Sequence, residues 1–319
     1  MLKRIIATLV ALSSCHAFGW GAVGHEIIAY TGANITVDGQ AFWQSNLEPI
    51  RQLTTVPDRI WKEPATKSGE GPNHWFQVDA YYTPANYSQI VQFPSAYSDA
   101  VTKYTQKTIT LNGTAPWRIR QLYQMAVLSF KSGDMKSALQ YAGAMSHYIG
   151  DISQPLHVSV DYDGQQTGNS GIHSYFETTI ITDELAIRAD VQTRAQKLLQ
   201  DANFLNQFNG NLMDAVLLEI ERSISYRDQV LKNDTQYGRT AQGAAIQLDL
   251  AKDRMADGAA TLSLILNQLW KDTGLVANAT PMTIQDPAWV QNNYNNLPEV
   301  RMTPIEQKFL ADDEDCQAR

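Results

Sequence analysis

The sequence predicts an all-α fold, a single-domain helical bundle with long loops. Apolar residues recur at three- and four-residue steps over long segments, whereas convincing runs of alternating strand pattern are scarce. The 319 residues are 44% hydrophobic and 18% charged, which excludes collagen-like, coiled-coil and wholly disordered chains. No linker, charge block or repeat of solenoid period divides the chain, so we expect one large domain.

The first nineteen residues have the pattern of a secretory signal peptide. Two basic residues precede an apolar run over 5–12, which is too short for a membrane span, and small residues follow. Residues 17–19 (AFG) favour cleavage before Trp20, whereas 12–15 (LSSC) resembles a lipoprotein box that would lipidate Cys15. We prefer cleavage before Trp20 and therefore expect a secreted or periplasmic protein.

The remaining chain is acidic. Cleavage removes two basic residues and no acidic one, so the net charge of −8 becomes −10. No basic groove is evident, and a nucleic-acid ligand would need another source of positive charge, such as bound metal. We expect a domain over 20–310 and an acidic, disordered tail over 311–319, in which Cys316 is the only cysteine left and cannot form an intramolecular disulfide.

The helical periodicity is clearest in the middle of the chain. Segments 117–133 and 134–153 predict a helical hairpin, with Ser132-Gly133-Asp134 as its turn and cap. Similar periodicity recurs at 183–208, at 211–230 and at 240–272, the last as one packing helix or a pair.

Two loops rich in Gly, Asp and Asn interrupt this pattern. They cover 62–73 and 161–172, and both lie between polar residues that could carry chemistry. We expect these loops to line the edge of a site.

Two histidines in predicted helices stand four residues before an acidic residue. His147 and Asp151 share one face of the predicted helix, and His173 and Glu177 repeat that spacing in a second helix. Imidazole beside carboxylate is a donor set that suits zinc.

The other histidines add to this pattern. Pro155 cannot continue a helix, so the chain turns there and can bring His157 back to the same cavity. His25 follows an N-terminal Trp-Gly-x-x-Gly, and His74 follows a Gly-rich loop. Any one histidine alone is more often a core or surface residue, but together they favour metal, and the spacing alone allows one or two zinc sites.

These strings resemble a known family. WGAVGH (20–25), the loop acid Asp58 before His74, HYIGDISQPLH (147–157) and Gly168-Asn169 before His173-x-x-x-Glu177 are similar to the zinc nucleases of the S-one/P-one and mung-bean type. The bacterial zinc phospholipases C share that superfamily. The resemblance implies a helical phospholipase C/nuclease-like fold with loops around a cluster of three zinc ions.

The resemblance also implies a set of ligands for each ion. The first ion would be bound by Asp58, His74, His147 and Asp151, the second by His157, His173 and Glu177, and the third by Trp20, His25 and Asp151. Asp151 would bridge two ions, and Asp58 would also orient the attacking water. In this family the N-terminal Trp binds through its free α-amine and carbonyl oxygen, which requires cleavage before Trp20.

The implied activity is phosphoric ester hydrolysis, in which hydroxide formed on zinc attacks phosphorus. A nuclease would cleave single-stranded RNA and DNA to 5′-phosphorylated products, with 3′-nucleotidase activity as an addition. In the nucleases an aromatic residue stacks on a base, and Trp75 matches it. An aspartate binds the base together with that aromatic residue, and Asp79 lies two residues later than its expected position. Asn169 matches the Gly-Asn pair of the nuclease motif.

Two alternatives stay open. Glu177, in place of the usual aspartate, and the short step from His157 to His173 are closer to phospholipase C. The first alternative is therefore hydrolysis of a phospholipid, or of another phosphomonoester or diester, and an apolar rim near 81–98 would be the marker of a phospholipase. A non-catalytic, zinc-stabilised binding protein is the second alternative, although the second ion has only three protein ligands, which favours catalysis. We expect a monomer whose partner is single-stranded nucleic acid or nucleotide, or phospholipid in the first alternative.

Overall fold

The computed structural model describes residues 20–62 and 70–275, and these ranges contain helices and turns without a β-strand. The all-α prediction is therefore confirmed. The signal-peptide and acidic-tail predictions, at 1–19 and 311–319, lie outside the described residues. No helix in the described part is long and apolar enough to cross a bilayer.

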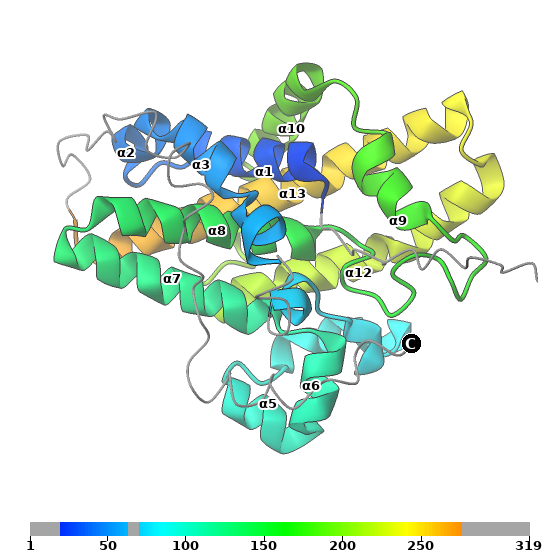
Figure 1. The fold of residues 1–319 in the computed structure, drawn as a ribbon, viewed down its shortest axis with the longest axis horizontal. Coiled ribbons are helices and arrows are strands. Elements are labelled where there is room, and N and C mark those ends of the chain that lie inside the picture. The colour runs from blue at the N-terminus through cyan, green and yellow to red at the C-terminus, as the bar shows by residue number, and fades with distance from the viewer. Residues whose placement is uncertain (1–19, 63–69, 276–319) are drawn as a thin grey trace, which may run out of the picture.

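Short elements make up the N-terminal part of the described chain (Figure 1). In chain order they are α1 (Ala22–Asn34), α2 (Gln40–Ser45), α3 (Leu47–Leu53), the π-helical turn η1 (Pro57–Trp61), the 3₁₀ turns η2 (Gly71–His74), η3 (Val78–Ala80) and η4 (Pro84–Gln92), α5 (Tyr97–Tyr104) and α6 (Gln106–Asn112).

Longer helices follow. They are α7 (Ala115–Ser132), α8 (Met135–Ser153), α10 (Glu184–Leu198), α12 (Leu212–Tyr237) and α13 (Ala241–Thr273), with the short α9 (Ile172–Ser174), the π-helical turn η5 (Tyr175–Thr179) and α11 (Ala202–Leu205) between them. Helices α7 and α8 lie side by side, and α8 also packs against α1, α3, α12 and α13 (Figure 1). Helix α8 is therefore central.

The predicted hairpin at 117–153 is confirmed, and its turn has the expected capping. Gly133 ends α7 with a positive φ of 80°, a conformation that glycine adopts without steric cost, and the Asp134 side chain accepts a hydrogen bond from the Ser137 amide at 3.1 Å.

Two segments differ from the sequence prediction. The 183–208 segment is two helices, because Asp201 caps a new start at α11. Helix α12 continues to Tyr237, seven residues beyond the predicted end. The 240–272 segment, predicted as one helix or a pair, is one helix of 33 residues that packs against α1, α10 and α12.

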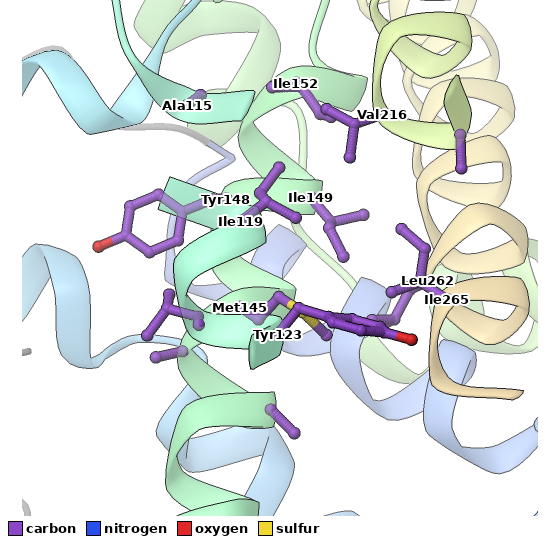
Figure 2. Packing of buried hydrophobic residues seen from close by; sticks show 14 of the residues in the cluster. Ala115, Ile119, Tyr123, Met145, Tyr148, Ile149, Ile152, Val216, Leu262 and Ile265 are labelled. Atoms are coloured by element: carbon purple, nitrogen blue, oxygen red, sulfur yellow. The ribbon is translucent and has the colours of Figure 1, made fainter. Parts of the chain in front are cut away.

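Apolar side chains from these helices meet in a core beside the centre of α8. Figure 2 shows residues of α7, α8, α12 and α13 that point toward one another, among them Ile119, Tyr123, Met145, Ile149, Ile152, Val216, Leu262 and Ile265. A second cluster gathers around α1, η5 and the middle of α13. The last turn of α8 lies between the two, where its polar residues are fixed by packing on several sides.

Candidate metal centre

The C-terminal half of α8 provides the centre of the site. His147 and Asp151 stand one turn apart on the same face, with His147 Nε2 3.3 Å from Asp151 Oδ2, and both side chains are fully buried. The helix ends at Ser153, and the Gln154 amide donates to the Asp151 carbonyl before the chain turns at Pro155. The helical prediction for this pair is confirmed.

Helix α1 places His25 against that face. Its ring stacks on His147 with 3.9 Å between the ring centroids, and its Nε2 lies 3.5 Å from Asp151 Oδ1. Gly150 permits this approach, because a Cβ at that position would lie 2.7 Å from His25 Nδ1. The glycine in the HYIGD string is therefore explained by helix packing.

Two turns complete the first group of ligands. His74, at the end of η2, directs Nδ1 toward Asp151 Oδ2 at 3.0 Å and toward His147 Nε2 at 2.9 Å. Asp58, in η1, lies 3.6 Å from His74 Nδ1 and 3.7 Å from His147 Nε2 through Oδ1. Lys62, one turn later, contacts the same oxygen at 2.7 Å.

His157, His173 and Glu177 form a second group. His157 Nδ1 donates to the His74 carbonyl at 2.6 Å, and His173 Nδ1 donates to the Tyr162 carbonyl at 2.8 Å. Each bond leaves Nε2 directed at the centre of the group, where the two Nε2 atoms are 3.1 Å apart. Glu177 Oε2 lies 2.9 Å from His173 Nε2. A backbone acceptor on the far nitrogen is the usual way in which a metal-binding histidine is oriented.

Asp151 connects the two groups. Its Oδ1 lies 3.6 Å from His157 Nδ1 and 3.5 Å from His25 Nε2, while Oδ2 faces the first group. The geometry identifies three sets of side chains that could each bind an ion, with ligand atoms within 4.8 Å of one another. These sets are His25, Asp58 and His147; His74, His147 and Asp151; and His157, His173 and Glu177.

The polar atoms of these groups fit a cation. His25 Nε2, Asp151 Oδ1 and Glu177 Oε2 are buried and have no hydrogen-bond partner in the described part of the chain. A buried polar atom without a partner costs free energy, and a metal ion between nitrogen and carboxylate donors removes that cost. The donor set of imidazole and carboxylate suits Zn²⁺.

The environment also favours the protonation states that metal binding needs. Burial lowers the pKa of His147 well below its ordinary value of 6.5, and His25 beside it acts in the same direction. Burial alone would raise the pKa of Asp58, but Lys62, His147 and His74 together hold it below its usual range. Neutral imidazole and ionised carboxylate are the forms that bind zinc.

Solvent reaches the cluster at two side chains. Asp58 is 10% exposed and His173 is 9% exposed, whereas the other histidines and acids of the cluster are almost fully buried. The site is therefore accessible to solvent beside Asp58 and His173, near the ends of the two predicted loops.

Trp20 lies at the base of the site. Its side chain is fully buried, packs on Phe176 with ring centroids 5.5 Å apart, and donates from Nε1 to Ser153 Oγ at 3.0 Å. The Gly21 amide donates to the Glu177 carbonyl at 3.2 Å. These contacts place the start of the described chain between α8 and η5, and the role of Trp20 as a ligand stays a prediction.

The three predicted substrate contacts have different surroundings. Trp75 is partly exposed and lies directly after His74, with Nε1 3.4 Å from the Leu111 carbonyl. Both Asp79 oxygens already accept hydrogen bonds, from Ser159 and Val160, and Arg227 pairs with it at 3.0 Å. Asn169 is buried and donates to α12, with Nδ2 3.1 Å from Asp234 Oδ2.

Sequence analysis did not identify Glu70, Arg118 and Tyr148, which form a buried network beside His74. Glu70 and His74 are four residues apart, the same spacing as the other pairs, and this signal lay within a segment interpreted only as a loop. Arg118 and Tyr148 lie within predicted helices, where nothing in the pattern set them apart from other helix positions.

Comparison with known sequences gives one family and two relatives of interest. The sequence profile of the S1/P1 nuclease family matches residues 20–271. Nuclease S1 of Aspergillus oryzae is 25% identical over 189 residues, which cover 56% of this chain and 60% of that protein. A protein of Bradyrhizobium tropiciagri named as a probable serine protease is 25% identical over 325 residues, with 79% of this chain and 38% of that protein covered. The match thus spans well under two thirds of the length of either relative.

Two solved structures are similar to the fold. Alpha-toxin from Clostridium absonum aligns with a TM-score of 0.48 and 15% identity, over 79% of this chain and 65% of the toxin. Alpha-toxin of an avian strain of Clostridium perfringens aligns with a TM-score of 0.45 and 16% identity, over 80% of this chain and 65% of the toxin.

Proposed function

The chain belongs to the S1/P1 nuclease family, and from this premise we propose that it is a zinc-dependent phosphoric ester hydrolase. The most specific form of the proposal is a nuclease that cleaves single-stranded RNA and DNA to 5′-phosphorylated products, with 3′-nucleotidase activity. The single observation that carries it is the convergence of five histidines with Asp58, Asp151 and Glu177, with a solvent-exposed edge at Asp58 and His173.

We propose the ligands that the family resemblance implies. The side chains proposed for the first and second ions lie close to one another, which supports this assignment. Trp20 is buried beside the last turn of α8, where its indole donates to Ser153, and we propose that its backbone completes the third set with His25 and Asp151. Bound zinc would supply a Lewis acid that activates water and neutralises phosphate charge, which suits a protein of net charge −10 after cleavage.

Asp58, Asp151 and Lys62 have distinct roles in the proposed function. Asp58 is the most exposed carboxylate of the cluster and can accept a hydrogen bond from the attacking water. Asp151 is fully buried, faces both groups of histidines and so fixes their separation. Lys62 lies at the same edge as Asp58 and keeps that carboxylate ionised.

A nucleic-acid substrate is supported by Trp75. The indole lies one residue after a proposed ligand and is partly exposed, so a base could stack on it without sequence readout. Within the described part of the 81–98 segment, Val91 is the one large hydrophobic residue with at least a third of its surface exposed, and it does not form an apolar rim. The phospholipid alternative therefore has less support than the nuclease.

We also propose export and cleavage before Trp20. The match to the family profile begins at this residue, which supports the proposal. Cleavage would give the α-amine that the family uses as a ligand.

A parallel hydrolysis assay tests the proposed function. The mature protein, with its zinc counted by elemental analysis, is given single-stranded RNA, single-stranded DNA, 3′-AMP and phosphatidylcholine. We expect zinc-dependent cleavage of the nucleic acids, lost on chelation and restored by zinc. Cleavage of phosphatidylcholine alone would favour the phospholipase C alternative over the nuclease. Bound zinc without hydrolysis of any substrate would favour the non-catalytic binding protein.

A further inference from the structure

Glu70 is a fully buried carboxylate immediately outside the metal centre. Its Oε2 accepts hydrogen bonds from Arg118 Nη2 at 2.9 Å and from Asn73 Nδ2 at 3.2 Å, and its Oε1 accepts one from the Tyr148 hydroxyl. The same Oε1 lies 3.4 Å from His74 Nε2. A buried charge is retained only where it is paired and hydrogen-bonded. The Glu70 carboxylate has three hydrogen-bond donors and also faces His74, a proposed metal ligand.

The partners of Glu70 are themselves held firmly. Arg118 on α7 is buried, its guanidinium lies over the Trp61 ring at 5.2 Å, and its Nε lies 3.4 Å from the Tyr148 hydroxyl. Tyr148 follows His147 on α8, and its ring is 5.1 Å from the ring of His74. The network therefore joins η2 to the two helices of the central hairpin.

The two nitrogens of His74 face different groups. Nδ1 faces the ligand atoms of His147 and Asp151 at 2.9 and 3.0 Å. Nε2 is buried, makes no hydrogen bond of good geometry with any described residue, and faces Glu70 at 3.4 Å. A proton on Nε2 would face the Glu70 carboxylate across this 3.4 Å contact.

We propose that Glu70 is a positioning residue for the metal centre: its carboxylate fixes the proton of His74 on Nε2, keeps Nδ1 directed at the metal, and strengthens this nitrogen as a zinc ligand. The inference rests on the proposed zinc centre. Carboxylates that accept from the far nitrogen of a ligating histidine orient the ring and raise its basicity, and their loss lowers metal affinity about 10- to 100-fold.

The test measures metal binding rather than hydrolysis. Zinc affinity is determined by competition with a chromophoric chelator, and the visible spectrum is recorded after Co²⁺ replaces zinc. Glu70→Gln removes the charge and keeps the shape, and we expect it to weaken zinc binding about 10- to 100-fold and to alter the Co²⁺ absorption bands. Tyr148→Phe removes one hydrogen bond to Glu70 and keeps the ring, so we expect a smaller loss, about threefold to tenfold.

Asp257→Asn is the matched control. Asp257 is also a buried carboxylate paired with arginines, Arg222 and Arg254, and it contacts no histidine among the described residues. Its loss should lower the unfolding midpoint and leave the Co²⁺ spectrum unchanged.

Each outcome decides the inference. Weaker zinc binding and a changed spectrum in the Glu70 and Tyr148 variants, but not in the control, support it. Wild-type zinc affinity in Glu70→Gln overturns it, and so does an equal loss in Asp257→Asn, which would show general destabilisation. If Glu70→Gln does not fold, an unchanged affinity in Tyr148→Phe overturns it. A wild-type protein that binds no zinc would overturn the proposed function as well, so the two failures are distinguishable.

Discussion

Asp151 shows how much a single residue's role follows from local sequence. Its contact with His147 is a consequence of helical spacing and was predicted from four residues of sequence. Its contacts with His25, His74 and His157, at 3.5, 3.0 and 3.6 Å, depend on how α1, η2 and the turn after Pro155 pack on α8. The turn at Pro155 gave a reason to expect His157 near Asp151, whereas the contacts with His25 and His74 could be named beforehand only through family resemblance, because no local pattern encodes them.

Replacement of His147 by alanine tests the proposed metal centre. The side chain is fully buried and belongs to two of the three candidate sets. We therefore expect His147→Ala to lose zinc and to reduce hydrolysis by at least about 100-fold, because loss of a residue that only hydrogen-bonds to a ligand already costs up to about 100-fold. Zinc content and initial rates measure the effect. Met145→Ala, a buried change on the same helix, should lower stability and retain zinc. Full activity with unchanged zinc content in His147→Ala would reject the ligand assignment.

At the scale of elements, two glycines of α8 set how closely other helices approach it. A Cβ at Gly150 would lie 2.7 Å from His25 Nδ1 on α1, and a Cβ at Gly143, two turns earlier, would lie 2.5 Å from the Leu53 Cβ on α3. The two positions are sterically similar, but only the first borders the metal centre. Substitutions at these two glycines therefore distinguish an effect on helix packing from an effect on the position of a ligand.

We expect each substitution by alanine to lower the free energy of unfolding by about 1–3 kcal/mol through overpacking. Gly150→Ala should also displace His25 and reduce zinc affinity, whereas Gly143→Ala should leave zinc affinity unchanged. Urea unfolding of the metal-free proteins and chelator competition measure the two effects. Equal zinc affinity in both variants would show that the position of His25 is not important for metal binding.

Helices α12 and α13 share a buried charge network that gives a pH prediction. Burial, with Asp257 beside it, raises the pKa of Glu219 to about 7, although Arg222 and Arg254 oppose this shift. The folded state then binds a proton more tightly than the unfolded chain, whose glutamate has the ordinary value of 4.5. The contribution of this group to stability is complete below pH 4.5 and is lost as the pH rises through 7.

We therefore expect the wild-type protein, without metal, to lose about 1–3 kcal/mol relative to Glu219→Gln between pH 5 and pH 8. The glutamine cannot ionise, so the difference between the two proteins isolates this group. Urea unfolding at four pH values in a chelating buffer measures it. A difference that does not change with pH would mean that Glu219 titrates alike in both states.

Across the whole molecule, periodicity predicted the class of fold and the central hairpin, because helices α7 and α8 have capped ends and clear apolar faces. It did not predict that α13 is one helix, since a long periodic segment fits both a single helix and a pair until its packing partners are known. The candidate ligand side chains lie between 25 and 177, and helices α12 and α13 beyond them pack on α8. The buried network around Glu70 depends on that global packing and was missed for this reason.

The proposed cleavage before Trp20 gives a final prediction for the molecule as a whole. Trp20 is buried, donates from its indole to Ser153, and is followed by Gly21, whose amide donates to the Glu177 carbonyl. If the α-amine of Trp20 is a ligand, any residue before it converts the amine into an amide, which has no lone pair to donate at neutral pH. A protein with Gly-Ser ahead of Trp20 should bind less zinc and hydrolyse substrate about 10- to 100-fold more slowly than one that begins at Trp20. The same dipeptide added at the other end of the chain is the control, with zinc content and initial rates as the measurements. Equal zinc and equal rates in the two proteins would reject both the ligand role of Trp20 and the requirement for cleavage before it.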